Sequence, residues 1–214
     1  MFIHLNTHSV YSAMRGLLPV NQLIQLSKSN GMDALALTDV NCLSGFINFV
    51  KYCNSMDVKP IAGANLITKN EDIIILVENQ VGYQNLCRII SKSYDIKDQK
   101  ISDIIVSHSS GLFILTEKYS ILKELKPVVS NTHLFVELRP GGSELESRKL
   151  AKKLKLEVVA TGNVYFHNRH DYESYLILQA INKNTKIDNV KKENDYSALN
   201  WFRNEESMAN LFPN

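Results

Sequence analysis

The chain has 214 residues, enough for one sizeable hydrophobic core, so a single domain is the default expectation. Hydrophobic residues make up 44% and charged residues 21%, which excludes a disordered, collagen-like or coiled-coil chain. The 24 Lys and Arg residues against 22 Asp and Glu residues give a formal charge of +2. This excess is too small to make the chain itself the main DNA-binding or membrane-binding surface.

The apolar runs and the cysteine content indicate the cellular compartment of the protein. The longest apolar runs, such as residues 73–77, are far below the roughly 20 residues that cross a bilayer. The amino terminus lacks the basic and apolar regions of a secretory signal. The 3 cysteines are odd in number and widely spaced, which is typical of reduced thiols. We therefore expect a cytoplasmic protein with no membrane partner.

Short apolar strands alternate with amphipathic helices along the chain. The pattern predicts strands at residues 2–7, 34–38, 60–66, 72–77, 112–116, 134–138 and 157–161. It predicts helices at residues 19–30, 46–53, 83–90, 172–181 and 205–211, and another that Ser143 opens with a Glu146 capping box. About seven strands with helices between them predict an α/β fold with a mainly parallel sheet. At this length the sheet closes naturally into a small TIM-like barrel, and an open doubly wound sheet is the alternative.

The sequence changes character near residue 184. Residues 183–192 are polar and lysine-rich, without the interleaved aromatic residues that bind single strands, so a solvated linker is favoured over a DNA groove. We predict a barrel domain over residues 1–183. Residues 184–214 would be a polar linker and the start of a connection to a further part of the protein.

Several ordered blocks of sequence resemble a known family. They are residues 4–12 (HLNTHSVYS), 34–39 (ALALTD), 59–63 (KPIAG), 82–88 (GYQNLCR) and 159–164 (VATGNV). These blocks are similar to the polymerase and histidinol phosphatase (PHP) domain, in the version that opens the bacterial DNA polymerase III alpha subunit. Residues 201–208 (WFRNEESM) resemble the family's link toward the polymerase body. The resemblance therefore implies that residues 184–214 begin the connection to a polymerase body that this fragment lacks. The resemblance implies a distorted seven-stranded barrel whose strand ends, in active members, hold up to three metal ions and hydrolyse phosphoesters.

The resemblance also shows which residues stand at the family's metal-ligand positions. The His-x-His pair reads Asn6-Thr7-His8, and Thr-Asp-His reads Thr38-Asp39-Val40. The closing Asp-x-His reads Asn163-Val164-Tyr165, and the glutamate of Gly-x-Glu is Asn65. The complete set of these vestigial positions is Asn6, His8, Arg15, Val40, Asn65, Asp72, Gly141, Asn163 and Tyr165.

Only His8 keeps the family's residue type, and Asp72 is a candidate substitute. A divalent ion needs several converging charged or imidazole donors, which neutral amides do not replace, and Arg15 adds a permanent positive charge. We therefore predict no bound metal and no catalytic residue. We expect Asn65 and Asn163 to hydrogen-bond each other or water in the former pocket.

Other candidate ligands have simpler interpretations. On a strand, His4 and His8 would lie about 13 Å apart, too far to share an ion. A solvated loop is favoured for His167 and His170, with Asp171 capping the next helix. Asp39 is expected to bond loop backbone rather than act as a general acid.

Three functions remain open at this point. The first is the amino-terminal PHP-like domain of a polymerase III alpha-type protein, inactive as a phosphoesterase. It would support the polymerase modules or dock a proofreading exonuclease or another replisome subunit. The parent protein would contact DNA and use Mg²⁺ for synthesis. The second is a metal-dependent phosphoesterase or 3'-5' exonuclease using His8, Asp39, Asp72 and His167. The third is a stand-alone binding module.

Overall fold

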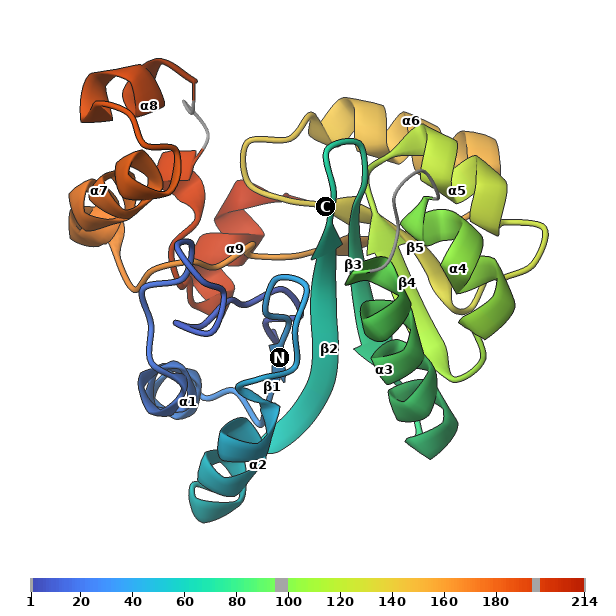
Figure 1. Cartoon of the computed structure of the whole chain (residues 1–214), viewed down its shortest axis with the longest axis horizontal. Coiled ribbons are helices and arrows are strands. Elements are labelled where there is room, and N and C mark those ends of the chain that lie inside the picture. Colours follow the sequence, from blue (N-terminus) through green and yellow to red (C-terminus); the bar gives the residue numbers. More distant parts are fainter. Residues whose placement is uncertain (1, 95–99, 194–196, 214) are drawn as a thin grey trace.

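The computed structural model describes residues 2–94, 100–193 and 197–213, and its core is a curled mixed sheet with helices packed around it (Figure 1). The six strands, in sheet order, are β1 (Ala34–Leu37), β2 (Lys59–Ile67), β3 (Asp72–Val77), β4 (Leu112–Thr116), β5 (Leu134–Leu138) and β6 (Glu157–Ala160). The main helices are α1 (Val20–Ser29), α2 (Phe46–Ser55), α3 (Gln80–Tyr94), α4 (Ile101–His108), α5 (Tyr119–Leu125), α6 (Glu144–Leu154), α7 (Tyr172–Asn182), α8 (Ile187–Glu193) and α9 (Glu205–Leu211). The predicted α/β class and barrel-like curvature are confirmed, with six regular strands rather than seven among these residues.

The segment expected as the first strand is not a regular strand, yet it lies where a seventh strand would close the barrel. The Ala36 and Thr38 amides donate to the His4 and Thr7 carbonyls at 3.0 and 2.9 Å. On the other side, the Val164 amide donates to the Asn6 carbonyl at 3.0 Å. These bonds are too widely spaced to form a continuous ladder, so only Thr7 and Val164 form a bridge.

One strand runs against the others. β2 pairs in antiparallel fashion with β3, and β3 with β4, whereas the remaining neighbours pair in parallel. The connection over residues 68–71 is too short for the helical crossover that a parallel pair requires, so a hairpin forms. As a result, the amino end of β3 lies beside the carboxyl ends of the other strands, which brings Asp72 to that edge.

The helices cover the outside of the sheet in two groups. Helices α3 to α6 pack over β2 to β5, where the largest cluster includes Leu66, Ile73, Ile114 and Val136. Helices α1 and α2 pack against β1 through a second cluster that includes Leu23, Leu35 and Phe49. No helix among the described residues is both long and apolar enough to cross a bilayer.

The carboxy-terminal part packs back on the barrel. Phe202 joins the α1 and α2 cluster, and its amide donates to the Phe166 carbonyl at 2.9 Å. The lysine-rich segment expected to be a linker contains α8, whose Val190 is buried against Leu176 and Ala180 of α7. In Figure 1, α7 and α8 project from the barrel as a helical pair. The polar sequence therefore has a helical part with one apolar face.

Candidate functional site

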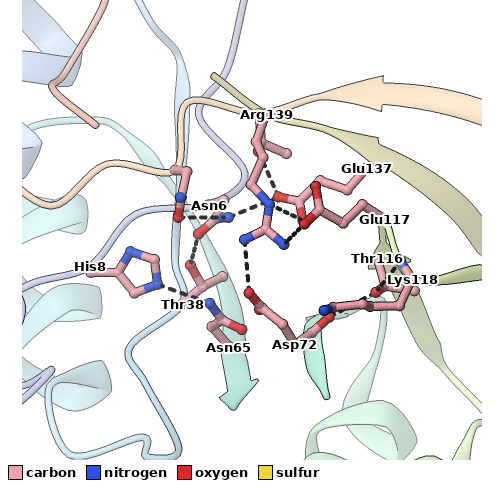
Figure 2. A network of polar contacts seen from close by, with 12 residues as sticks. Asn6, His8, Thr38, Asn65, Asp72, Thr116, Glu117, Lys118, Glu137 and Arg139 are labelled. Carbon is pink, nitrogen blue, oxygen red and sulfur yellow. Dashed lines mark hydrogen bonds and ion pairs between the residues drawn. The ribbon is translucent and has the colours of Figure 1, made fainter. Parts of the chain in front are cut away.

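The strand ends converge on a buried polar network at one end of the barrel (Figure 2). Asn6 and His8 come from the amino-terminal segment, Asn65 from β2, and Asp72 from the start of β3. Asn163 follows β6 and adopts a left-handed conformation with φ 46°. The structure thus brings together residues that are up to 157 positions apart in sequence.

Five of the nine vestigial positions line one cavity of about 350 Å³. They are Arg15, Asp72, Gly141, Asn163 and Tyr165. Asn6, His8 and Asn65 are fully buried in the adjoining network, and Val40 bridges Asn65 through the backbone. The nine positions therefore lie in and around a single site, as their order in the sequence predicts.

The amides are hydrogen-bonded to partners other than those expected. The Asn6 side chain donates to Glu137 Oε1 at 2.9 Å and to Asn163 Oδ1 at 3.4 Å. The Asn65 side-chain nitrogen lies 3.4 Å from His8 Nε2. Asn65 and Asn163 thus have separate protein partners, so the first of the two expected alternatives, a bond between them, is wrong.

His8 is held as a buried neutral ring. It stacks on Tyr165 with ring centroids 4.0 Å apart, and its Nδ1 lies 3.0 Å from the Val164 carbonyl oxygen. Burial lowers the pKa of His8 to about 3, because the imidazolium would lose its hydration. Burial also raises the pKa of the Tyr165 phenol. At neutral pH both rings are uncharged.

The centre of the network is an arginine that the sequence analysis did not single out as a site residue. Arg139 follows β5 directly, and its side chain is only 11% exposed. It contacts the carboxylates of Asp72 at 2.9 Å, Glu117 at 3.1 Å and Glu137 at 3.7 Å. Burial opposes the charge of Arg139, but the three carboxylates together hold its pKa above the ordinary value. The guanidinium is therefore a permanent cation.

Glu137 is the deepest carboxylate of this group. Its side chain is fully buried, and its Oε1 accepts from the Thr161 hydroxyl at 2.7 Å. Burial raises the pKa of Glu137, and the Arg139 charge opposes that shift. Glu137 and Arg139 are two residues apart on an extended segment, so their side chains share one face. This alternation is the sequence signal that would have identified the pair.

Asp39 forms a separate cluster beneath the first loop. Its carboxylate accepts from the Ser9 amide at 2.7 Å and from the Ser9 and Ser12 hydroxyls at 2.8 and 2.6 Å. Burial raises the pKa of Asp39, although these hydrogen bonds oppose the shift. Asp39 therefore anchors loop backbone, as expected.

The remaining histidine candidates lie apart from this network. His4 is buried beside Phe202, and its Nε2 lies 2.8 Å from the Arg203 carbonyl oxygen. His167 is half-buried, and His170 is exposed in a short 3₁₀ turn at Arg169–Asp171. Asp171 is the N-cap residue of α7, as expected, although its side chain accepts from the Asn168 amide rather than from an amide of α7.

The donor set does not fit a metal ion. Three of the family's ligand positions are neutral amides, and Val40 and Gly141 offer no side-chain donor. Across the described ranges 2–94, 100–193 and 197–213, no group of three or more His, Cys, Asp and Glu residues is arranged to hold one. The carboxylates that do face the site are paired with Arg139 instead.

Comparison with known proteins identifies relatives of this chain. The PHP domain family matches residues 4–166. The DNA polymerase III subunit alpha of Vibrio cholerae is 31% identical over 245 aligned positions, and that of Escherichia coli K12 is 30% identical over 248. Each alignment covers 99% of this chain and 21% of the relative, so the chain spans about a fifth of their length.

Solved structures show the same fold at low sequence identity. A putative metal-dependent phosphoesterase from Bifidobacterium adolescentis has a TM-score of 0.53 at 9% identity, covering 75% of this chain and 86% of that one. An amidohydrolase from Chromobacterium violaceum has a TM-score of 0.55 at 11% identity, covering 76% and 87%. These likenesses extend to the architecture alone.

Proposed function

The chain belongs to the PHP domain family, and from this premise we propose that it is the amino-terminal PHP domain of a DNA polymerase III alpha-type protein. In this proposal the domain has lost metal-dependent phosphoester hydrolysis and serves as a structural or docking module. The similarity to the amino-terminal fifth of such subunits supports the assignment of the parent protein. The parent would be a DNA-directed DNA polymerase that uses Mg²⁺ outside these 214 residues.

The observation that carries the loss of hydrolysis is the position of Arg139. Its guanidinium lies within 2.9 to 3.7 Å of three carboxylates at the strand ends. A divalent ion there would be repelled by the guanidinium and would compete with it for the same oxygens. His8 is neutral and therefore able to bind a metal, yet its Nε2 faces the amide of Asn65.

In the scaffold role that we propose, the domain contacts other proteins or other parts of its own chain. The partners we propose are the polymerase modules of the same protein and a proofreading exonuclease or other replisome subunit. The near-neutral charge of +2 supports protein contacts over direct binding of DNA, which the parent would bind elsewhere.

Metal analysis combined with a hydrolysis assay tests the loss of activity. The purified chain is incubated with Zn²⁺, Mn²⁺ or Mg²⁺, desalted, and assayed for bound metal and for cleavage of single-stranded DNA and a nitrophenyl phosphodiester. We expect far less than one ion per chain and the same background rate in wild type and His8→Ala. Two or three retained ions, with cleavage that His8→Ala abolishes, would instead establish the phosphoesterase or 3'-5' exonuclease alternative.

Sedimentation tests the docking role. The chain is mixed with a purified replicative proofreading exonuclease, with the exposed variant Arg148→Ala as a folded comparison. Sedimentation of the two proteins as one complex supports docking on this domain. If they sediment separately at about 10 µM each, the exonuclease is not its partner, and the proposed role is limited to supporting the polymerase modules of the same protein.

A further inference from the structure

The inner face of the curled sheet is polar at one end and apolar at the other. Along β5, Phe135 and Glu137 point to the same face, because side chains alternate along a strand. Glu137 belongs to the polar network at the carboxyl ends of the parallel strands, whereas Phe135 lies near their amino ends. Phe135 lines a hollow of about 570 Å³ together with Ile61 of β2 and Val159 of β6. This hollow shares no lining residue with the cavity of about 350 Å³, so it is a separate site.

The apolar side chains in the hollow are less buried than those on the outer face of the sheet. Phe113 and Phe135 face inward and are only partly buried. Ile114 and Val136, the next residues along the same strands, pack under the helices and are fully buried. The interior of a small closed barrel is normally filled by its own side chains. Here the inner face keeps apolar surface that is available to a further molecule.

The wall of the hollow includes elements other than the strands. Leu5 of the amino-terminal segment and Phe46 of α2 also line it. In Figure 1, α2 and the start of β2 lie together at the lower end of the sheet. A volume of about 570 Å³ is within the range of small-molecule sites, which are concave and mostly apolar. A concave wall of this kind suits a compact ligand better than the flat surface of a partner protein.

Two charged residues, Lys59 and Glu78, line the edge of the hollow. Glu78 Oε2 lies 3.4 Å from His133 Nε2, and the His133 ring stacks on Phe113 with centroids 4.7 Å apart. Lys59 is exposed and forms no ion pair with any Asp or Glu of the residues that the structure describes. An ammonium without a carboxylate partner beside an apolar hollow favours an acidic group on the ligand.

We propose that this hollow binds one small, largely apolar molecule that carries an acidic head group, such as an aromatic sulfonic or carboxylic acid. The apolar body of the ligand contacts Phe113, Phe135 and Val159, and its acidic group lies at the edge beside Lys59. Such a ligand is an addition to the proposed scaffold role, and neither depends on the other.

Two fluorescent probes with the same ring system test this site. Anilinonaphthalene sulfonate has an acidic head group, and phenylnaphthylamine is its neutral analogue without the sulfonate. Each probe is titrated into the full chain, and the rise in fluorescence gives the Kd and the number of sites. The variants are Val159→Phe, which fills the hollow, and Lys59→Gln, which removes the ammonium. The matched controls are the exposed residues of Val106→Phe on α4 and Lys69→Gln beyond the other end of β2.

We expect wild type to bind both probes at a single saturable site. Val159→Phe should weaken the binding of both probes by about tenfold or more, because its ring occupies the space of the ligand. Lys59→Gln should weaken the binding of anilinonaphthalene sulfonate roughly threefold and leave that of phenylnaphthylamine unchanged. Both controls should bind as wild type does. Equal Kd values for Val159→Phe and wild type overturn the proposal, and so does the same effect of Lys59→Gln on both probes.

A second variant and a measurement on the wild-type chain cover the case in which Val159→Phe does not fold. Ile61→Phe fills the same hollow from β2, and circular dichroism shows whether each variant is folded. Weakened binding by folded Ile61→Phe supports the proposal, and binding like that of wild type overturns it. Methyl NMR spectra of the wild-type chain need no substitution. Probe-induced shifts at the Ile61 and Val159 methyl groups support the proposal, and shifts confined to methyl groups elsewhere overturn it.

Discussion

The Arg139 guanidinium donates a hydrogen bond of 2.9 Å to the Asp72 carboxylate, and this contact joins the end of β5 to the start of β3 across β4. Both side chains are largely shielded from water, with exposed fractions of 11% and 23%. The pair therefore interacts in a medium that screens charge less than bulk water does. It closes the rim at the place where the sheet reverses direction.

Loss of the Arg139 cation should destabilise the chain strongly. Arg139→Leu leaves Asp72 and the fully buried Glu137 without their positive partner, and breaking a buried pair in this way costs about 3–5 kcal/mol. Urea unfolding followed by circular dichroism measures the change. Arg148→Ala removes an exposed pair and should cost no more than about 0.5 kcal/mol. Equal effects of the two substitutions would show that the Arg139 cluster contributes little.

His8 should make the chain sensitive to mild acid. Its folded pKa of about 3 lies below the ordinary histidine value of 6.5, so the unfolded state binds the proton more readily. The stability that neutral His8 provides is present above pH 6.5 and is lost as pH falls toward 3. Between pH 7.5 and 4.5 this loss amounts to about 2–3 kcal/mol.

The variant His8→Gln isolates this effect from opposing groups. The raised pKa values of Asp39 and Glu137 favour the folded state as pH falls, so wild-type stability alone mixes the two trends. Urea midpoints at several pH values should fall less steeply for His8→Gln than for wild type. The exposed His170→Gln serves as the control. Parallel curves for wild type and His8→Gln would contradict the assignment of a buried neutral ring.

Much of the strand pattern could be predicted because each strand is specified locally. The expected ranges 72–77, 112–116 and 134–138 match β3, β4 and β5, because short apolar runs between polar turns have few other ways to be buried. Direction was harder to predict. The connection at residues 68–71 has four residues and no helix, which makes β3 antiparallel to β2. The alternation of strands and helices elsewhere in the chain had predicted a mainly parallel sheet.

The location of the candidate site was predictable, whereas its internal pairing was not. Strand-end residues such as Asn6, Asn65 and Asn163 converge because the fold brings strand ends together. The sequence places Arg15 at a ligand position, but the cation among the carboxylates is Arg139. Its partners Asp72 and Glu117 are distant in sequence, and no local periodicity encodes such a long-range pair.

Gly16 should tolerate no side chain, because it lies against the backbone of the loop that covers Asp39. A Cβ atom at Gly16 would lie 1.9 Å from the Ser9 carbonyl oxygen, and backbone cannot yield as a flexible side chain would. Gly16→Ala should therefore cost about 3 kcal/mol in unfolding free energy. Gly31→Ala is the comparison, since φ is +71° there and nothing lies within 4 Å. Gly31→Ala should cost about 1 kcal/mol from backbone conformation alone. A cost for Gly31→Ala larger than that for Gly16→Ala would contradict this prediction.

The residues after 183 should be required for the barrel to fold, because they cover its amino-terminal segment. The Tyr165 amide donates to the Asn200 carbonyl at 2.9 Å, and buried Phe202 packs on the His4 ring at a centroid distance of 4.4 Å. A chain of residues 1–183 would lose both contacts and expose Phe166 to water. Burying a phenylalanine alone contributes about 2–3 kcal/mol, a large fraction of the stability of one domain.

Circular dichroism measures the melting temperatures of the full chain and of residues 1–183, and limited proteolysis measures how fast each is cleaved. We expect residues 1–183 to melt at least 10 °C below the full chain, or to remain insoluble, and to be cleaved rapidly near Phe166. The full-length variant Phe202→Ala should cost about 3–4 kcal/mol, which places the effect on this contact if the shortened chain cannot be purified. If residues 1–183 melt like the full chain, the domain boundary predicted at residue 183 is sufficient for folding, and the segment that follows contributes no stability to the barrel.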